Sequence, residues 1–165
     1  MAGHYRLRLI ETVIALHDQA ALSELCRAVD VGQRAEKGVA AFAEAAVPVI
    51  RAVWDESHTT TPSLGIGLHR SGLVRTLALI ATQSVVSPTT RDWLVAFDRQ
   101  LLSVPSDWLI IEAGIDLAVS LKDLDLIGRV RAIASDVNQV VALGVAAPED
   151  AEHVQKHATN RLSQP

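Results

Sequence analysis

The chain has 165 residues, of which 49% are hydrophobic and only 4% aromatic, and its formal net charge is −4. This length is typical of one domain, so we expect residues 1–165 to form a single domain with an aliphatic core. The negative charge argues against a dedicated nucleic-acid-binding protein, because such proteins usually carry a basic face. The only cysteine, Cys26, rules out an intramolecular disulfide, which favours a reducing, cytoplasmic location.

The sequence does not show the pattern of a signal peptide or of a membrane span. The N-terminus alternates Arg6 and Arg8 with apolar residues, and the most apolar windows, 39–54 and 108–121, contain charged residues. Cys26 lies among aliphatic residues at helical spacing, which predicts a buried and inert thiol.

Apolar residues recur at three- and four-residue spacing along most of the chain. This pattern predicts an all-α fold of about seven or eight helices in antiparallel pairs. We expect the first two helices near 5–17 and 20–32, followed by a longer helix over 35–54. Pro48 lies inside this third helix, and its ring removes an N–H and clashes with the preceding turn, so we expect a kink near 44–47.

The longest irregular stretch of the sequence follows, a loop at 56–70. Ser71 is expected to cap the helix that follows, and Ser87 with Pro88 is a strong helix start. Later helices are expected to begin at Ser106, after Asp123 with a continuation toward Gly144, and at Pro148.

Two helical pairs about a hundred residues apart resemble each other. The aliphatic pattern around Glu11 matches the pattern around Glu112, and Arg27 is matched by Arg131. Amphipathic helical hairpins share aliphatic positions by chance, and we favour chance over true repetition.

The succession of short helices in pairs of roughly 30 to 45 residues resembles the HEAT and armadillo class of helical repeats. This resemblance implies a curved surface that binds a protein partner, and it brings no catalytic residue. The chain departs from the HEAT pattern, because the typical Asp and Val-Arg positions are not kept in each pair and the last pair lacks a clear second helix. The competing architecture is a closed orthogonal bundle with the 35–54 helix at its centre.

The 56–70 loop and the helix start after it form the first candidate site. His58, His69, Arg70, Ser71 and Arg75 could bind a small molecule or an anion, since free N–H groups and arginines attract negative charge. The loop would then act as a lid. The Lys-Ser/Thr ending of a Walker loop is absent, and the simpler interpretation is a flexible connection whose serine caps a helix.

His153 and His157 are four residues apart, which is the spacing of two zinc ligands on one helix face. No third ligand can be identified by spacing, so the simpler interpretation is a pair of surface histidines. Glu112 and Asp116 form a second pair at this spacing, and they are expected to lie on a solvated helix flank. We therefore expect no cofactor.

Trp54, Trp93 and Trp108 lie at helix ends or in first turns, which predicts core anchors, or interaction hot spots if one is exposed. Because no catalytic motif is present, we expect a non-enzymatic protein-interaction or scaffold module, self-associating or part of a larger assembly. The alternative is a helical domain, with or without enzymatic activity, that binds a small molecule or an anion under the 56–70 loop.

Overall fold

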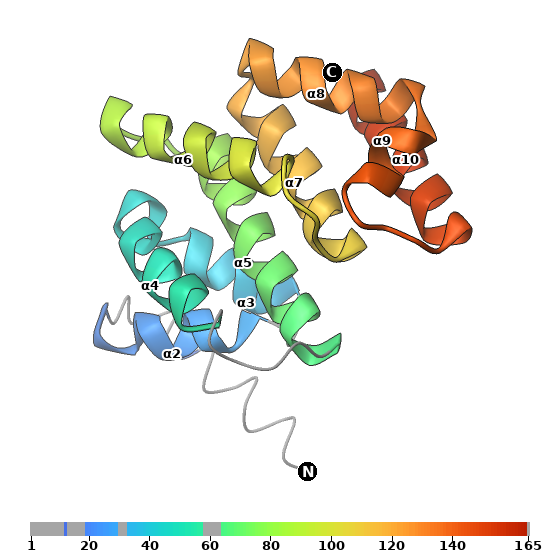
Figure 1. Cartoon of the computed structure of the whole chain (residues 1–165). Coiled ribbons are helices and arrows are strands. Elements are labelled where there is room, and N and C mark those ends of the chain that lie inside the picture. The colour runs from blue at the N-terminus through green and yellow to red at the C-terminus, as the bar shows by residue number, and fades with distance from the viewer. Residues whose placement is uncertain (1–11, 13–18, 30–32, 58–63, 165) are drawn as a thin grey trace. The chain divides into compact units, whose positions relative to one another are not determined.

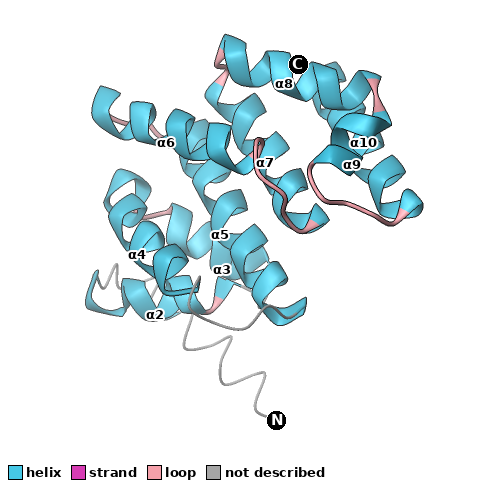
Figure 2. Ribbon diagram, viewed as in Figure 1, coloured by secondary structure: helices cyan, strands magenta, loops and turns pink. Residues whose placement is uncertain are grey.

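The computed structural model describes residues 12, 19–29, 33–57 and 64–164, and every regular element in these ranges is helical. The predicted all-α class is therefore confirmed (Figures 1 and 2). The chain divides into two compact units, Met1–Val86 and Ser87–Pro165. Buried aliphatic residues fill the interior of both units.

The N-terminal unit contains η1 (Gln19–Ala21), α2 (Leu22–Arg27), α3 (Gln33–Ala40), η3 (Ala43–Ala46), α4 (Val47–Ser57) and α5 (Leu64–Gln83). α3 packs against α5, and α2 packs against α3 and α4. The aliphatic residues Leu73, Leu77 and Ile80 of α5 are almost fully excluded from solvent. The expected first helix, apart from residue 12, and the expected end of the second at 32 lie outside the described residues.

The prediction of one kinked helix over 35–54 is wrong. α3 ends at Ala40, Ala43 adopts a positive φ of 51°, and the short η3 leads into a new helix, α4. Pro48 is the second residue of α4, where a helix makes no internal use of the backbone N–H. The proline therefore marks a helix start and not a kink.

The predicted loop at 56–70 is too long, because α4 continues to Ser57 and α5 already begins at Leu64. Gly65 and Gly67 suggested irregular structure, yet a helix tolerates glycine at about 1 kcal/mol per residue when its other residues pack. Ser71 consequently lies inside α5 and does not cap it. Its hydroxyl is fully buried and donates to the Leu68 carbonyl over 2.9 Å.

The C-terminal unit contains α6 (Pro88–Leu101), α7 (Trp108–Leu121), α8 (Leu124–Ser135), α9 (Val137–Ala142) and α10 (Pro148–Ser163). α7 packs against α6, α8 and α10, and α10 also packs against α8 and α9. Ile111, Ile115 and Leu117 of α7 are completely buried. α7 is therefore the central helix of this unit.

Side-chain caps define the starts of α6 and α7. Ser87 accepts a hydrogen bond from the Thr90 N–H, which confirms the predicted start of α6. α7 is capped by Asp107, one residue after the expected Ser106, and its carboxylate accepts from the Leu109 N–H over 2.9 Å. A carboxylate is a strong acceptor for the free N–H groups of a first turn.

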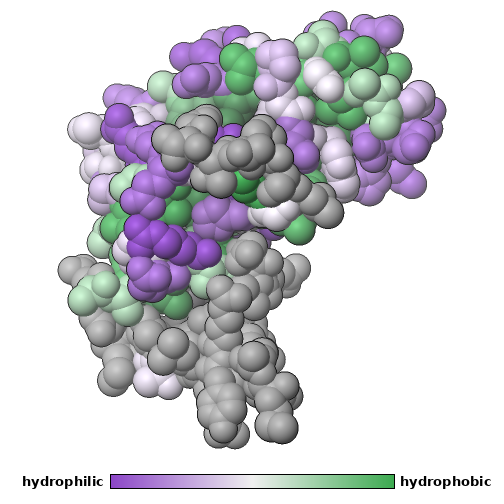
Figure 3. Space-filling view, turned by 60° about the horizontal axis from the view of Figure 1, so that its bottom comes forward, coloured by the Kyte–Doolittle hydropathy of each residue, from purple (hydrophilic) through white to green (hydrophobic). Residues whose placement is uncertain are grey.

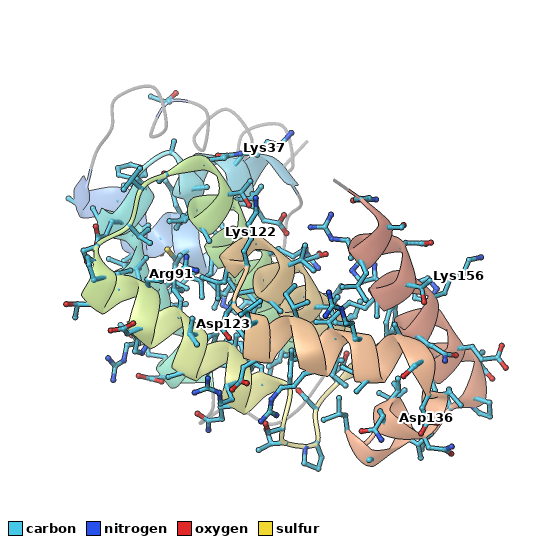
Figure 4. All side chains as sticks on the ribbon, turned by 90° about the horizontal axis from the view of Figure 1, so that it is seen from above. Lys37, Arg91, Lys122, Asp123, Asp136 and Lys156 are labelled. Carbon is cyan, nitrogen blue, oxygen red and sulfur yellow. The ribbon has the colours of Figure 1, made fainter. Side chains whose placement is uncertain are left out.

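Two further aspartates cap α8 and α9, and Figure 4 labels both. Asp123 follows Lys122, whose left-handed backbone ends α7. Asp136 ends α8 and at the same time begins α9. We had expected the helix after Asp123 to continue toward Gly144. It ends instead at Ser135, because Asp136 begins a new helix.

Candidate functional site

Two histidines of α10 face two carboxylates of α7. His153 Nε2 lies 3.1 Å from Glu112 Oε1, and His157 Nε2 lies 3.0 Å from Asp116 Oδ1. Because both pairs have i, i+4 spacing, the contacts form two successive rungs between the helices. We call these four residues the His–acid cluster. The sequence had pointed to each pair separately, and the tertiary structure brings them together.

Asp116 of the cluster contacts two basic side chains. Its Oδ1 lies 2.7 Å from Arg161 Nε, in addition to its contact with His157. The hydrogen bond to Asp116 raises the pKa of His157, and the charges of Asp116 and Glu112 act in the same direction, whereas burial and Arg161 oppose the rise. The cluster therefore favours the protonated, cationic form of His157.

Trp108 borders the cluster at the start of α7. Its ring meets the His153 ring edge to face, with 5.5 Å between the ring centroids. The His153 side chain is 62% exposed, whereas that of His157 is 27% exposed. The inner rung, between His157 and Asp116, is therefore the better shielded of the two.

The arrangement does not have the geometry of a metal centre. Within the described parts of the chain, no group of three or more His, Cys, Asp or Glu side chains could hold a metal ion. His153 and His157 direct their Nε2 atoms to different carboxylates and do not share one point between them. The chemistry that the cluster supports is proton binding.

The residues predicted for the anion site fall into two separate sets in the N-terminal unit. In the first set, Arg75 binds Glu36 of α3 through Nε, at 3.0 Å, and through Nη2, at 2.9 Å. Its Nη1 donates to Ser71 Oγ over 3.2 Å. The Glu36 side chain is only 5% exposed and that of Arg75 is 36% exposed, so a nearly buried carboxylate already neutralises the cation.

The second set surrounds Arg70. The Arg70 guanidinium lies over the Trp54 ring, 4.8 Å from its centroid, and its Nε donates to Ser57 Oγ over 2.9 Å. Burial lowers the pKa of Arg70. His69 is half-buried, and His58 lies outside the described residues. The contacts of Arg70 and Arg75 thus link α5 to different helices and do not converge on one ligand position.

The three tryptophans differ in burial, and each ring contacts another side chain of its own unit. Trp54 is buried beneath Arg70, and Trp93 stacks on Phe97 with 5.1 Å between the centroids. Trp93 and Trp108 are both half-buried. Each ring therefore has a packing partner within its own unit.

Sequence reasoning missed Asp98 of α6, which is completely buried. Neither carboxylate oxygen has a hydrogen-bond partner. Burial raises the pKa of Asp98 well above its usual range. A signal was present, since Asp98 lies four residues after Leu94 and three before Leu101, both of which are buried. An acidic residue within an apolar helix face of this kind predicts a buried carboxyl group.

An apolar surface lies where the α6–α7 turn meets the α9–α10 turn. The Ser106 N–H donates to the Leu143 carbonyl over 2.9 Å. Gly144, with φ of 91°, approaches Pro105 so closely that an added Cβ would lie 3.0 Å from the Pro105 Cβ. The surrounding exposed residues, which we call the apolar end, are Val104, Pro105, Val141, Ala142, Gly144 and Ala146.

Hydrophobic residues also reach the surface in other places. Figure 3 shows groups of hydrophobic residues between hydrophilic ones on the face turned to the viewer. In the part of the chain that the structure describes, no helix is long and apolar enough to cross a membrane. The chain was compared with protein-family models, with curated proteins and with solved structures, and none of these comparisons gave a match.

Proposed function

We propose that this chain is a non-enzymatic protein-interaction module that associates with further copies of itself through the apolar end. The observation that carries the proposal is the exposure of large aliphatic side chains there. Val104, in the α6–α7 turn, is 43% exposed, and Val141, near the end of α9, is 50% exposed. Exposed apolar residues on adjoining segments are typical of protein interfaces, because covering them removes apolar area from water.

Polar groups surround the apolar end. Ser103 and Asp107 lie on the α6–α7 side, and Glu149 lies at the start of α10. An apolar centre with a polar rim is the usual organisation of a protein–protein contact. The short helices α6 to α10 also agree with the HEAT-like or armadillo-like organisation that we propose for the chain.

The candidate polar sites support an interaction module better than an enzyme. Arg75 is neutralised by Glu36, and the His153 and His157 rings are held by carboxylates of α7. The alternative function, binding of a small molecule or an anion near Arg70 and Arg75, has less support because these contacts occupy the guanidinium groups.

Native mass spectrometry of the full chain tests the proposal. We expect masses at whole multiples of 17.7 kDa in the unmodified protein. Val141→Asp should shift the population to the single chain, since a buried charge at an interface is strongly unfavourable. Val85→Asp is the matched control, because Val85 is 99% exposed and lies outside the apolar end.

Two outcomes would contradict the proposal. One is a mass of a single chain at every concentration tested, together with binding of a fluorescent hydrophobic probe that is absent or is unchanged by Val141→Asp. The other is an assembly that Val141→Asp and Val85→Asp weaken equally, because the contact would then not involve the apolar end.

A further inference from the structure

Two titratable contacts hold the central helix α7 from different sides. On the α6 side, Asp98 lies against Gly114, where an added Cβ would be 3.2 Å from Asp98 Oδ1. On the α10 side, Asp116 binds His157. Gly114 and Asp116 are only two residues apart in α7. Changes of protonation at both contacts therefore act on the same short segment.

The surroundings of Asp98 favour the protonated carboxyl group. The side chain is fully buried, and both oxygens lack hydrogen-bond partners. An isolated carboxylate in such a position is strongly disfavoured, so the group binds a proton and becomes neutral. The Asp98 carboxyl group and the Leu102 side chain both lie next to the position that a Gly114 Cβ would take, so the absence of a side chain at Gly114 leaves room for them.

The charged residues of α8 that reach α6 have other partners. Asp125 accepts a hydrogen bond from Arg99 over 3.3 Å. Arg129 donates to the Ser103 hydroxyl and to the Leu102 carbonyl. Neither residue hydrogen-bonds the Asp98 carboxyl group. Ionisation of Asp98 would therefore be uncompensated.

The His157 contact is strengthened by protonation. The carboxylates facing His157 are Asp116 and Glu112 of α7, and Arg161 of α10 shares Asp116 with it. On the α8 side, α10 is held by a neutral contact, in which Gln155 donates to the Ala134 carbonyl. The negative charge of the two carboxylates is therefore best balanced when His157 is a cation.

We propose that protonation of Asp98 and His157 stabilises the C-terminal unit. Loss of the proton from Asp98 loosens α6 from α7, and loss of the proton from His157 loosens α10 from α7. Both groups bind protons more strongly in the folded unit than in the unfolded chain. Their contributions to stability are therefore fully present below the ordinary pKa of each group, and they are lost as the pH rises through the raised value in the folded state. The two effects have the same sign and add.

Hydrogen exchange of the full chain, measured by mass spectrometry at about pH 6 and about pH 8.5, tests this proposal. Each variant is compared with the unmodified chain at the same pH, so that intrinsic exchange rates cancel. Asp98→Asn keeps the size of the side chain but cannot ionise. We expect it to slow exchange in α6 by about tenfold at the higher pH, with a smaller effect at the lower pH.

His157→Gln keeps a polar side chain but cannot become a cation. We expect it to speed exchange in α10 at about pH 6, with a smaller effect at about pH 8.5. Asp92→Asn is the control for Asp98→Asn, and Lys156→Gln, which removes an exposed cation from α10, is the control for His157→Gln. Peptides from α2 to α5 serve as an internal reference in every sample.

The proposal is overturned if Asp98→Asn and His157→Gln change exchange by the same factor at both pH values. A second measurement applies if Asp98→Asn does not fold. The urea midpoint of a Trp54→Phe chain, in which Trp93 and Trp108 are the remaining tryptophans, should fall between about pH 6 and about pH 8.5 when followed by fluorescence. A constant or rising midpoint would also overturn the proposal.

Discussion

Arg75 of α5 and Glu36 of α3 form an ion pair across 39 residues of chain, in which the Arg75 Nε and Nη2 atoms lie 3.0 Å and 2.9 Å from the same oxygen, Glu36 Oε1. The Glu36 carboxylate is nearly buried, so removal of one partner leaves the other charge without its neutralising group. The pair therefore holds α3 to α5 in one register.

We predict that Glu36→Ala lowers the free energy of unfolding by about 2 kcal/mol, measured by urea denaturation. Glu24→Ala is the control, because Glu24 also pairs with an arginine, Arg27, but at the surface, with 77% of its own side chain exposed. It should cause no measurable loss. Equal losses in the two variants would show that burial of Glu36 does not decide the effect.

Two helical glycines should respond oppositely to alanine. A Cβ at Gly72 would lie 3.0 Å from the Val29 carbonyl oxygen, a backbone atom that cannot move without shifting the chain on either side of it. Gly72→Ala should therefore destabilise the N-terminal unit by about 1–3 kcal/mol. A Cβ at Gly128 meets nothing within 4 Å, so Gly128→Ala should stabilise the protein by about 0.5–1 kcal/mol through helix propensity.

The change in thermal midpoint of each alanine variant is the simplest measurement. A midpoint that rises in Gly72→Ala would mean that α5 and the Val29 backbone are farther apart in solution. A lower thermal midpoint in Gly128→Ala would mean that another part of the protein or another copy of it contacts α8 at Gly128.

Cys26 should be inert while the protein is folded. The thiol is completely buried, and burial raises its pKa to about 12, with a smaller opposing effect from Arg27. The thiolate is the reactive form, so at about pH 8 an aromatic disulfide reagent should react with Cys26 very slowly. Unfolding in urea should expose the thiol and bring the reaction to completion at once.

The absorbance of the released thiolate follows this reaction directly. Fast and complete labelling of the folded chain would contradict the burial of α2. Labelling that speeds up in Gly72→Ala would be consistent with local opening of the same unit.

The N-terminus of α10 lacks a side-chain cap, because Ala147 occupies the capping position before Pro148. We predict that Ala147→Ser stabilises the protein by about 1 kcal/mol, since a serine hydroxyl can accept a free N–H of the first turn. Asp123→Ala should have the opposite effect of similar size, because Asp123 caps α8 through the N–H groups of Asp125 and Leu126.

Urea midpoints of these variants provide the comparison. Ala146→Ser is the control for Ala147→Ser, because it introduces the same hydroxyl one residue away from the capping position. Equal shifts in the two serine variants would exclude capping as the cause.

The sequence by itself determined the all-α class and several of the helix boundaries. Helical spacing of apolar residues is a local property of the chain, and so is the preference of serine followed by proline for a helix start. Ser87 is accordingly an N-cap, and Leu73 and Leu77 are buried. Local signals were misleading where packing opposed them, as at Ser71, which is buried within α5 although it resembles a cap.

Only the tertiary structure decided which polar residues meet. His157 is 41 residues from Asp116, and Arg75 is 39 from Glu36, so no spacing rule relates the partners. The unpartnered Asp98 likewise depends on the close approach of α7 at Gly114. Helix periodicity determines which side of a helix a residue occupies, but the partner on the opposing helix depends on how the helices pack. The packing of the whole unit therefore determines whether a charged side chain is paired with an opposite charge, exposed to solvent or buried without a partner.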